Sequence, residues 1–88
     1  MRSIEITIRG RVQGVGFRYY TLRLANELQI TGYVRNKPDG SVFIEAEGDN
    51  MNIQAFLSWC RQGPPRAYVE EVIVNDCPPA GYLRFDVR

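Results

Sequence analysis

The chain has 88 residues, which is the size of one domain, and 44% of them are hydrophobic, so it can build a modest core without disulfide bonds. Its net charge of +1 gives no broad attraction for nucleic acid or an anionic membrane. No apolar run approaches the roughly 20 residues that cross a bilayer, and we expect no signal peptide. Two cysteines and no histidine exclude a disulfide framework and every scheme that needs His. We expect one cytoplasmic domain over residues 1–88.

The first predicted elements are a strand and a helix. Over residues 4–12 one face of the strand is apolar and the other polar, with Ile4, Ile6, Ile8 and Val12 on the apolar side. From Phe17 the apolar residues recur at helical spacing, which predicts an amphipathic helix. Its apolar stripe comprises Phe17, Tyr20, Leu24, Ala25 and Leu28, with Thr21 on the same side.

A hairpin and a second helix follow. Residues 31–36 are β-branched and aromatic, which predicts a strand, and the turn signal of residues 37–40 leads into an antiparallel strand at 41–48. Asp49 or Asn50 can cap the second helix, which Gly63 and two prolines end. Its core face is predicted to carry Ile53, Phe56, Leu57 and Cys60.

The C-terminal part predicts two more strands. In the strand at 67–74 the valines do not keep one parity, which suggests a bulge. A loop at 75–81 precedes a short strand at 82–87, with Leu83, Phe85 and Val87 on one face. The element order predicts an α+β, ferredoxin-like sandwich of two split βαβ units (βαββαβ), with two helices on one face of an antiparallel sheet. This fold hosts many functions, so it settles none by itself.

The junction between the first strand and the first helix, GRVQGVGFR at residues 10–18, is rich in glycine. It matches neither a P-loop nor a dinucleotide fingerprint, since the only lysine is Lys37 and position 19 is Tyr. A glycine-rich turn at a helix start still points N–H groups inward at the positive end of the helix dipole, which suits a phosphate. Arg18 can add a planar fork of donors. A simpler interpretation is a tight turn beside a solvated arginine, and the residues alone leave both open.

Asn36 ends the second predicted strand, just before the hairpin. The first two strands of a split βαβ unit run parallel, so Asn36 and the glycine junction are expected at the same edge of the sheet. Its amide can then point toward the same hollow and hold a water molecule. The alternative is that Asn36 only caps the turn. Of the two cysteines, Cys60 is expected as a packed thiol and Cys77 as a surface thiol.

Longer stretches make the pattern more specific. GRVQGVGFR at 10–18 resembles the first signature of the acylphosphatase family, and GYVRNKPDGSVFIEAEG at 32–48 resembles the second. GPPRAYVEEV at 63–72 resembles the family's link into its fourth strand. The resemblance implies a small cytosolic enzyme that hydrolyses the carboxyl–phosphate bond of acyl phosphates.

The resemblance also implies roles for particular residues. By motif position, the family's phosphate-binding arginine falls on Arg18 and its water-orienting asparagine on Asn36. Two positions depart from the family pattern: Gln29 stands where glycine is common, and Phe43 where an acidic residue is frequent. If position 29 has a positive φ, Gln29 carries roughly 1 kcal/mol of strain. The phosphate cradle falls on Gly14, Val15, Gly16 and Phe17.

The implied chemistry needs no histidine, because the leaving carboxylate, with a pKa around 4, is stable as an anion near pH 7. The enzyme has to hold the phosphoryl group, offset its charge and aim a water in line. We expect no metal and no cofactor. We expect a monomer acting on a small-molecule acyl phosphate, with inorganic phosphate as product and inhibitor and with no nucleic-acid or membrane partner.

Two other classes of function compete with this hypothesis. A ferredoxin-like RNA-binding module needs exposed aromatic residues and a basic surface, whereas the polar face of the first strand carries Glu5, Thr7, Arg9 and Arg11. The stronger alternative is a catalytically idle anion-binding or regulatory domain with the same cradle. Hydrolysis of benzoyl phosphate distinguishes an enzyme from such a domain.

Overall fold

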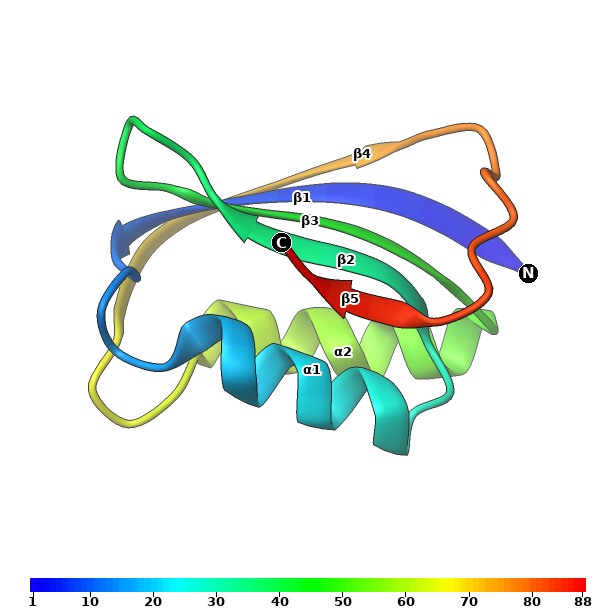
Figure 1. Ribbon diagram of the computed structural model, residues 1–88, viewed down its shortest axis with the longest axis horizontal. Helices are drawn as coiled ribbons and strands as arrows, with labels where there is room; N and C mark the ends of the chain where they lie inside the picture. Colours follow the sequence, from blue (N-terminus) through cyan, green and yellow to red (C-terminus); the bar gives the residue numbers. More distant parts are fainter.

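The elements follow the predicted order, and the computed structural model describes all of residues 1–88 (Figure 1). In chain order they are β1 (Arg2–Arg11), α1 (Phe17–Glu27), β2 (Thr31–Asn36), β3 (Val42–Gly48), α2 (Asn50–Gln62), β4 (Tyr68–Asp76) and β5 (Phe85–Val87).

The five strands form one sheet in the order β4-β1-β3-β2-β5, and both helices cover the same face of it (Figure 1). β1 pairs antiparallel with β3 and β4, and β2 pairs antiparallel with β3. These four strands and two helices confirm the predicted ferredoxin-like α+β sandwich. β5 adds to the outer edge of β2 in the parallel direction, so the complete sheet is mixed rather than wholly antiparallel.

The core lies between the sheet and the helices. Strand alternation turns Ile4, Ile6 and Ile8 toward the helices, where all three are fully buried. The predicted core face of α2 is confirmed, since Ile53, Phe56, Leu57 and Cys60 are all buried.

The buried face of α1 is narrower than predicted. Phe17, Thr21 and Ala25 are buried in successive turns, whereas Tyr20 is 40% exposed, so its placement in the core was wrong. Residues spaced by four lie on one line along the helix, and Tyr20 falls to the side of that line. Thr21 is tolerated in the core because its hydroxyl donates to the carbonyl oxygen of Phe17 at 2.8 Å.

The predicted bulge is present in β4. Arg9 of β1 faces Glu71, but the next residue, Gly10, faces Val69, so β4 has one extra residue there. Gly10 has φ +132, and a Cβ at this position would lie 2.1 Å from the carbonyl oxygen of Tyr68. Only glycine therefore allows this close approach of the two strands.

The loop between β4 and β5 folds over the sheet face opposite the helices. The carboxylate of Glu47, which is 8% exposed, accepts backbone N–H bonds from Ala80, Gly81 and Tyr82. The Tyr82 hydroxyl donates to Glu45 at 2.8 Å, and burial together with that carboxylate raises the pKa of Tyr82 to about 12. This anchoring carries the chain across to β2.

The last strand is shorter than predicted. It begins at Phe85, so the 97% exposed Leu83 lies outside the strand, and the prediction that Leu83 shares one strand face with Phe85 and Val87 was wrong. Neither helix is long and apolar enough to cross a membrane.

Candidate active site

One end of the sheet gathers the predicted site residues. β1 and β2 both run antiparallel to β3 and hence in the same direction, so the loop after β1 and the last residue of β2 lie at the same end (Figure 1). A cavity of about 340 Å³ opens there. It is lined by Val12, Gly14, Gly16, Phe17, Arg18, Tyr19, Leu22, Asn36 and Val87.

The loop before α1 is shaped by two glycines in the left-handed region. Gly14 has φ +74 and Gly16, the N-cap of α1, has φ +80. A Cβ on Gly14 would meet nothing within 4 Å, so backbone conformation rather than space requires this glycine. No side chain caps the helix, and no acidic residue lies in its first turn. No acidic side chain of α1 therefore neutralises the positive N-terminal end of its helix dipole.

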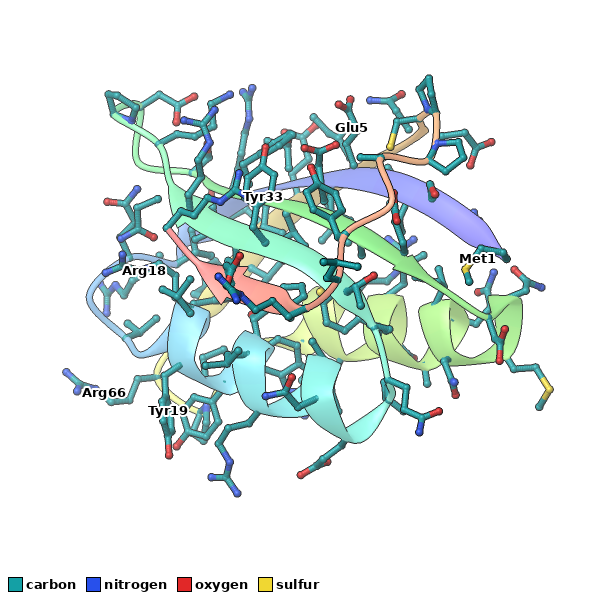
Figure 2. All side chains as sticks on the ribbon, turned by 45° about the vertical axis from the view of Figure 1, so that its right-hand side comes forward. Met1, Glu5, Arg18, Tyr19, Tyr33 and Arg66 are labelled. Atoms are coloured by element: carbon teal, nitrogen blue, oxygen red, sulfur yellow. The ribbon has the colours of Figure 1, made fainter.

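Arg18 is exposed at the end of the molecule where α1 begins (Figure 2). Its Nη1 donates a long hydrogen bond of 3.4 Å to the backbone oxygen of Arg88, directly after β5. None of the three ion pairs in the structure involves Arg18. The guanidinium keeps most of its donors for a ligand in the cavity.

Asn36 lies across the cavity at the end of β2. Its Oδ1 is buried and has no hydrogen-bond partner, and it is the only buried side-chain nitrogen or oxygen of the chain in this condition. A buried amide oxygen without a partner costs about 1–3 kcal/mol, so such an atom in a native protein calls for a functional reason.

The alternative role of Asn36 as the cap of the turn is wrong, because Asp39 fills it. Asp39 Oδ1 accepts the backbone N–H of Ser41 at 2.9 Å and the Ser41 hydroxyl at 2.6 Å. These bonds lower the pKa of Asp39 and close the turn by an Asx-type interaction. The Asn36 side chain is thereby left for the cavity.

The predicted cradle is brought together only in part. Gly14, Gly16 and Phe17 line the cavity, but Val15 does not, because its half-buried side chain packs against the core. Phe17 anchors the start of α1, with its ring 5.3 Å from that of Trp59. Any contribution of Val15 to a cradle comes from its backbone.

Sequence reasoning missed the apolar wall of the cavity, formed by Tyr19, Leu22 and Val87. The sequence gives a weak indication for Leu22, since it lies one helical turn after Arg18 and so on the same side of α1. It gives none for Val87, because the position of Val87 depends on how β5 pairs. No group of three or more His, Cys, Asp or Glu side chains is arranged so that it could hold a metal ion.

The fold and this cavity define a class: a small ferredoxin-like α+β domain with a glycine loop, an arginine that forms no ion pair and an asparagine with a buried, unpartnered amide oxygen at one end of its sheet. Comparisons with known proteins narrow the class. A model of the acylphosphatase family matches residues 4–87. The acylphosphatases of Thermotoga maritima and of a Nocardioides species are 48% and 49% identical to this chain, cover all of it, and are themselves covered over 98% and 90%. The solved acylphosphatase structure from Bacillus subtilis has a TM-score of 0.97 at 36% identity, covering 100% of this chain and 99% of that chain.

The chain therefore belongs to the acylphosphatase family. It is an enzyme that hydrolyses acyl phosphates.

Proposed function

We propose that this hydrolysis takes place in the cavity at the α1 end of the sheet, without a metal or cofactor. The loop at residues 14–17 and Arg18 hold the phosphoryl group, and Asn36 orients the attacking water. One observation carries the proposal: Arg18, the glycine loop and the unpaired, buried Oδ1 of Asn36 line the same cavity.

The glycine loop and Arg18 supply the positive potential that a phosphoryl group needs. Successive N–H groups at a helix N-terminus point at an anion there, and the helix dipole adds to the attraction. Arg18, which makes no ion pair, can present two parallel N–H donors to two phosphoryl oxygens.

Asn36 suits the nucleophile rather than the phosphate. Its Oδ1 is an acceptor and repels phosphoryl oxygens, but it can accept a hydrogen bond from water and so fix the direction of attack. The water oxygen forms a bond to phosphorus while the bond between phosphorus and the acyl oxygen breaks, and the carboxylate leaves with that electron pair. A proton of the water passes to a phosphate oxygen of the substrate. No general acid is required, because the carboxylate is a stable anion near pH 7.

The acyl group is expected on the apolar side of the cavity. Tyr19 and Leu22 of α1 and Val87 of β5 offer aromatic and aliphatic surface beside the proposed phosphate site. Such a wall favours an apolar acyl group over a charged one, since burial of apolar surface is the attraction available there. Benzoyl phosphate is therefore a suitable substrate for the test.

The test follows benzoyl phosphate by its ultraviolet absorbance, before and after exhaustive treatment with EDTA. We expect equal rates, and competitive inhibition by inorganic phosphate. In a phosphate titration, the amide resonances of residues 14–18 should shift more than any others. Loss of activity on chelation, restored by a divalent ion, contradicts the proposed mechanism. Phosphate binding without hydrolysis identifies the idle anion-binding domain instead.

The same proposal includes a cytoplasmic monomer whose partners are small molecules only. Size-exclusion chromatography with light scattering checks the monomer.

A further inference from the structure

Gln13 lies in the glycine loop, but its side chain reaches a different part of the chain. Its Nε2 donates to the backbone carbonyl oxygens of Lys37 at 2.8 Å and Ser41 at 2.9 Å, which lie 24 and 28 residues further along. Both bonds are partly buried. An amide nitrogen has two hydrogens, so Gln13 uses its full donor capacity on the turn between β2 and β3.

The two carbonyl groups that Gln13 contacts are the ones that close this turn. The N–H of Lys37 donates to the carbonyl oxygen of Ser41 at 2.9 Å, and the N–H of Gly40 donates to that of Lys37 at 3.1 Å. Gln13 supplies each oxygen with a second hydrogen bond, for its second lone pair. One side chain thus connects the loop before α1 to the end of the hairpin.

The connection joins the two halves of the proposed site at adjacent residues. Gln13 precedes Gly14, the first residue of the proposed cradle, and Lys37 follows Asn36 directly. No other side-chain hydrogen bond links the loop at 12–16 to the hairpin. This link therefore ties the residue before the cradle to the residue after Asn36.

From this geometry we propose that Gln13 is a positioning residue: it sets the distance between the phosphate cradle and Asn36, and so the line along which the water attacks. The proposal rests on the roles proposed above for the cradle and Asn36. A misplacement of about 1 Å can lower a rate by about 100-fold, so a residue that touches no reacting atom can control turnover.

The test variant is Gln13→Glu, which keeps the shape of the side chain. Near pH 7 the carboxylate has no donor and repels both carbonyl oxygens, so kcat for benzoyl phosphate should fall by about 10- to 100-fold. In the uncharged variant Gln13→Met, inhibition by inorganic phosphate should stay within about threefold of the parent, because neither the cradle nor the charge beside it changes. Toward about pH 5 the carboxyl group becomes partly protonated and regains one donor, so the ratio of variant to parent kcat should rise.

Two further variants isolate the hydrogen bonds. Gln13→Met has similar length but no donor at any pH, so its loss of kcat should show no recovery in acid. Gln54→Glu makes the same chemical change at an exposed position of α2 and should match the parent throughout. If Gln13→Glu does not fold, Gln13→Met and the side-chain amide resonances of Asn36 carry the test. Those resonances should move in Gln13→Met even without substrate.

The outcomes separate this proposal from the one it rests on. A parent that fails to hydrolyse benzoyl phosphate overturns the proposed function, while a shift of the Asn36 amide in Gln13→Met still supports the positioning role. Unchanged kcat in an active parent background overturns the role of Gln13 alone. The role of Gln13 is also overturned if Gln13→Glu loses both kcat and phosphate affinity while the ratio of variant to parent kcat stays constant with pH. General loosening of the fold would produce that pattern.

Discussion

The two halves of the sandwich, β1–α1–β2 and β3–α2–β4, repeat one topology but differ at the junction from strand to helix. In the first half residues 12–16 separate β1 from α1, with Gly14 and Gly16 in the left-handed region. In the second half Asp49 alone separates β3 from α2, with φ −64 and ψ 145. Only the first junction lines the cavity described above.

The difference between the two junctions indicates why the first is the better candidate for binding an anion. Both helices have a positive N-terminal end, and neither is capped by a side chain. A single extended residue leaves no concave backbone, whereas a longer loop with positive φ turns N–H groups inward. Charge differs as well: Arg18 follows the first junction, while Asp49 is itself the second.

The strands that follow the two helices, β2 and β4, end in side chains of different charge. β2 ends in Asn36, whose unpaired Oδ1 lines the cavity. Its counterpart β4 ends in Asp76, a carboxylate that forms a 3.8 Å ion pair with Arg2. The second half therefore presents negative charge where the first presents donors and an amide.

Removing the charge of the first junction should have the largest effect. We expect Arg18→Ala to lower kcat/KM for benzoyl phosphate by about 1,000-fold and to weaken phosphate inhibition, because one group stabilises both bound phosphate and transition state. Arg18→Lys keeps the charge but loses the paired donors, so it should also lose most of the activity. Steady-state kinetics and phosphate inhibition check both variants. A fully active Arg18→Lys shows that charge alone matters.

Removing the Asn36 amide at the end of β2 should lower turnover and leave phosphate affinity nearly unchanged. Asn36→Ala is expected to lower kcat by about 100-fold or more, the scale of a lost positioned group, with phosphate affinity within a few-fold of the parent. An interaction made only in the transition state lowers kcat without raising KM. Circular dichroism confirms the fold of the variant. If phosphate binding disappears while hydrolysis at saturating substrate persists, Asn36 belongs to the cradle instead.

Two glycines with the same φ, one inside the proposed cradle and one outside it, distinguish an effect on phosphate binding from the general cost of a left-handed backbone. Gly14 and Gly81 both have φ +74, and a Cβ on either meets nothing within 4 Å. Gly14→Ala and Gly81→Ala should each lower the free energy of unfolding by about 1 kcal/mol, the cost of a left-handed non-glycine residue. Only Gly14→Ala should weaken phosphate inhibition. Urea unfolding and inhibition assays check the pair, and equal inhibition in both variants removes Gly14 from the cradle.

The smallest expected effect lies at the opposite ends of the helices. α2 ends in Gly63 with φ +73, whereas α1 is followed by Gln29 with φ 55, the only non-glycine residue with positive φ. Gln29→Gly should raise the free energy of unfolding by up to about 1 kcal/mol, less the extra freedom of glycine in the unfolded chain. Activity should not change, since the site lies at the other end of α1. A destabilised Gln29→Gly means that the Gln29 side chain stabilises the helix end.

The sequence by itself determined the order of the elements and the end of the sheet at which the candidate site residues lie. Strand alternation, helical spacing and the need of glycine for positive φ are local properties, so they are readable without neighbours. Once the element order indicated a split βαβ unit, parallel directions of β1 and β2 placed Arg18 and Asn36 at one end, where the structure has them. Their catalytic roles remain predictions.

Tertiary structure alone decided which side chains complete the cavity. Val87 reaches it because Glu47 anchors a loop more than 30 residues away and so directs β5 to the edge of β2. Gln13 crosses to the hairpin because both ends of that contact are fixed by separate strands. Tyr20 and Leu83 fit apolar patterns yet are exposed, since burial depends on whether another element arrives to cover a residue. Such contacts join segments that no local pattern connects, and only the packed chain brings them within hydrogen-bond distance.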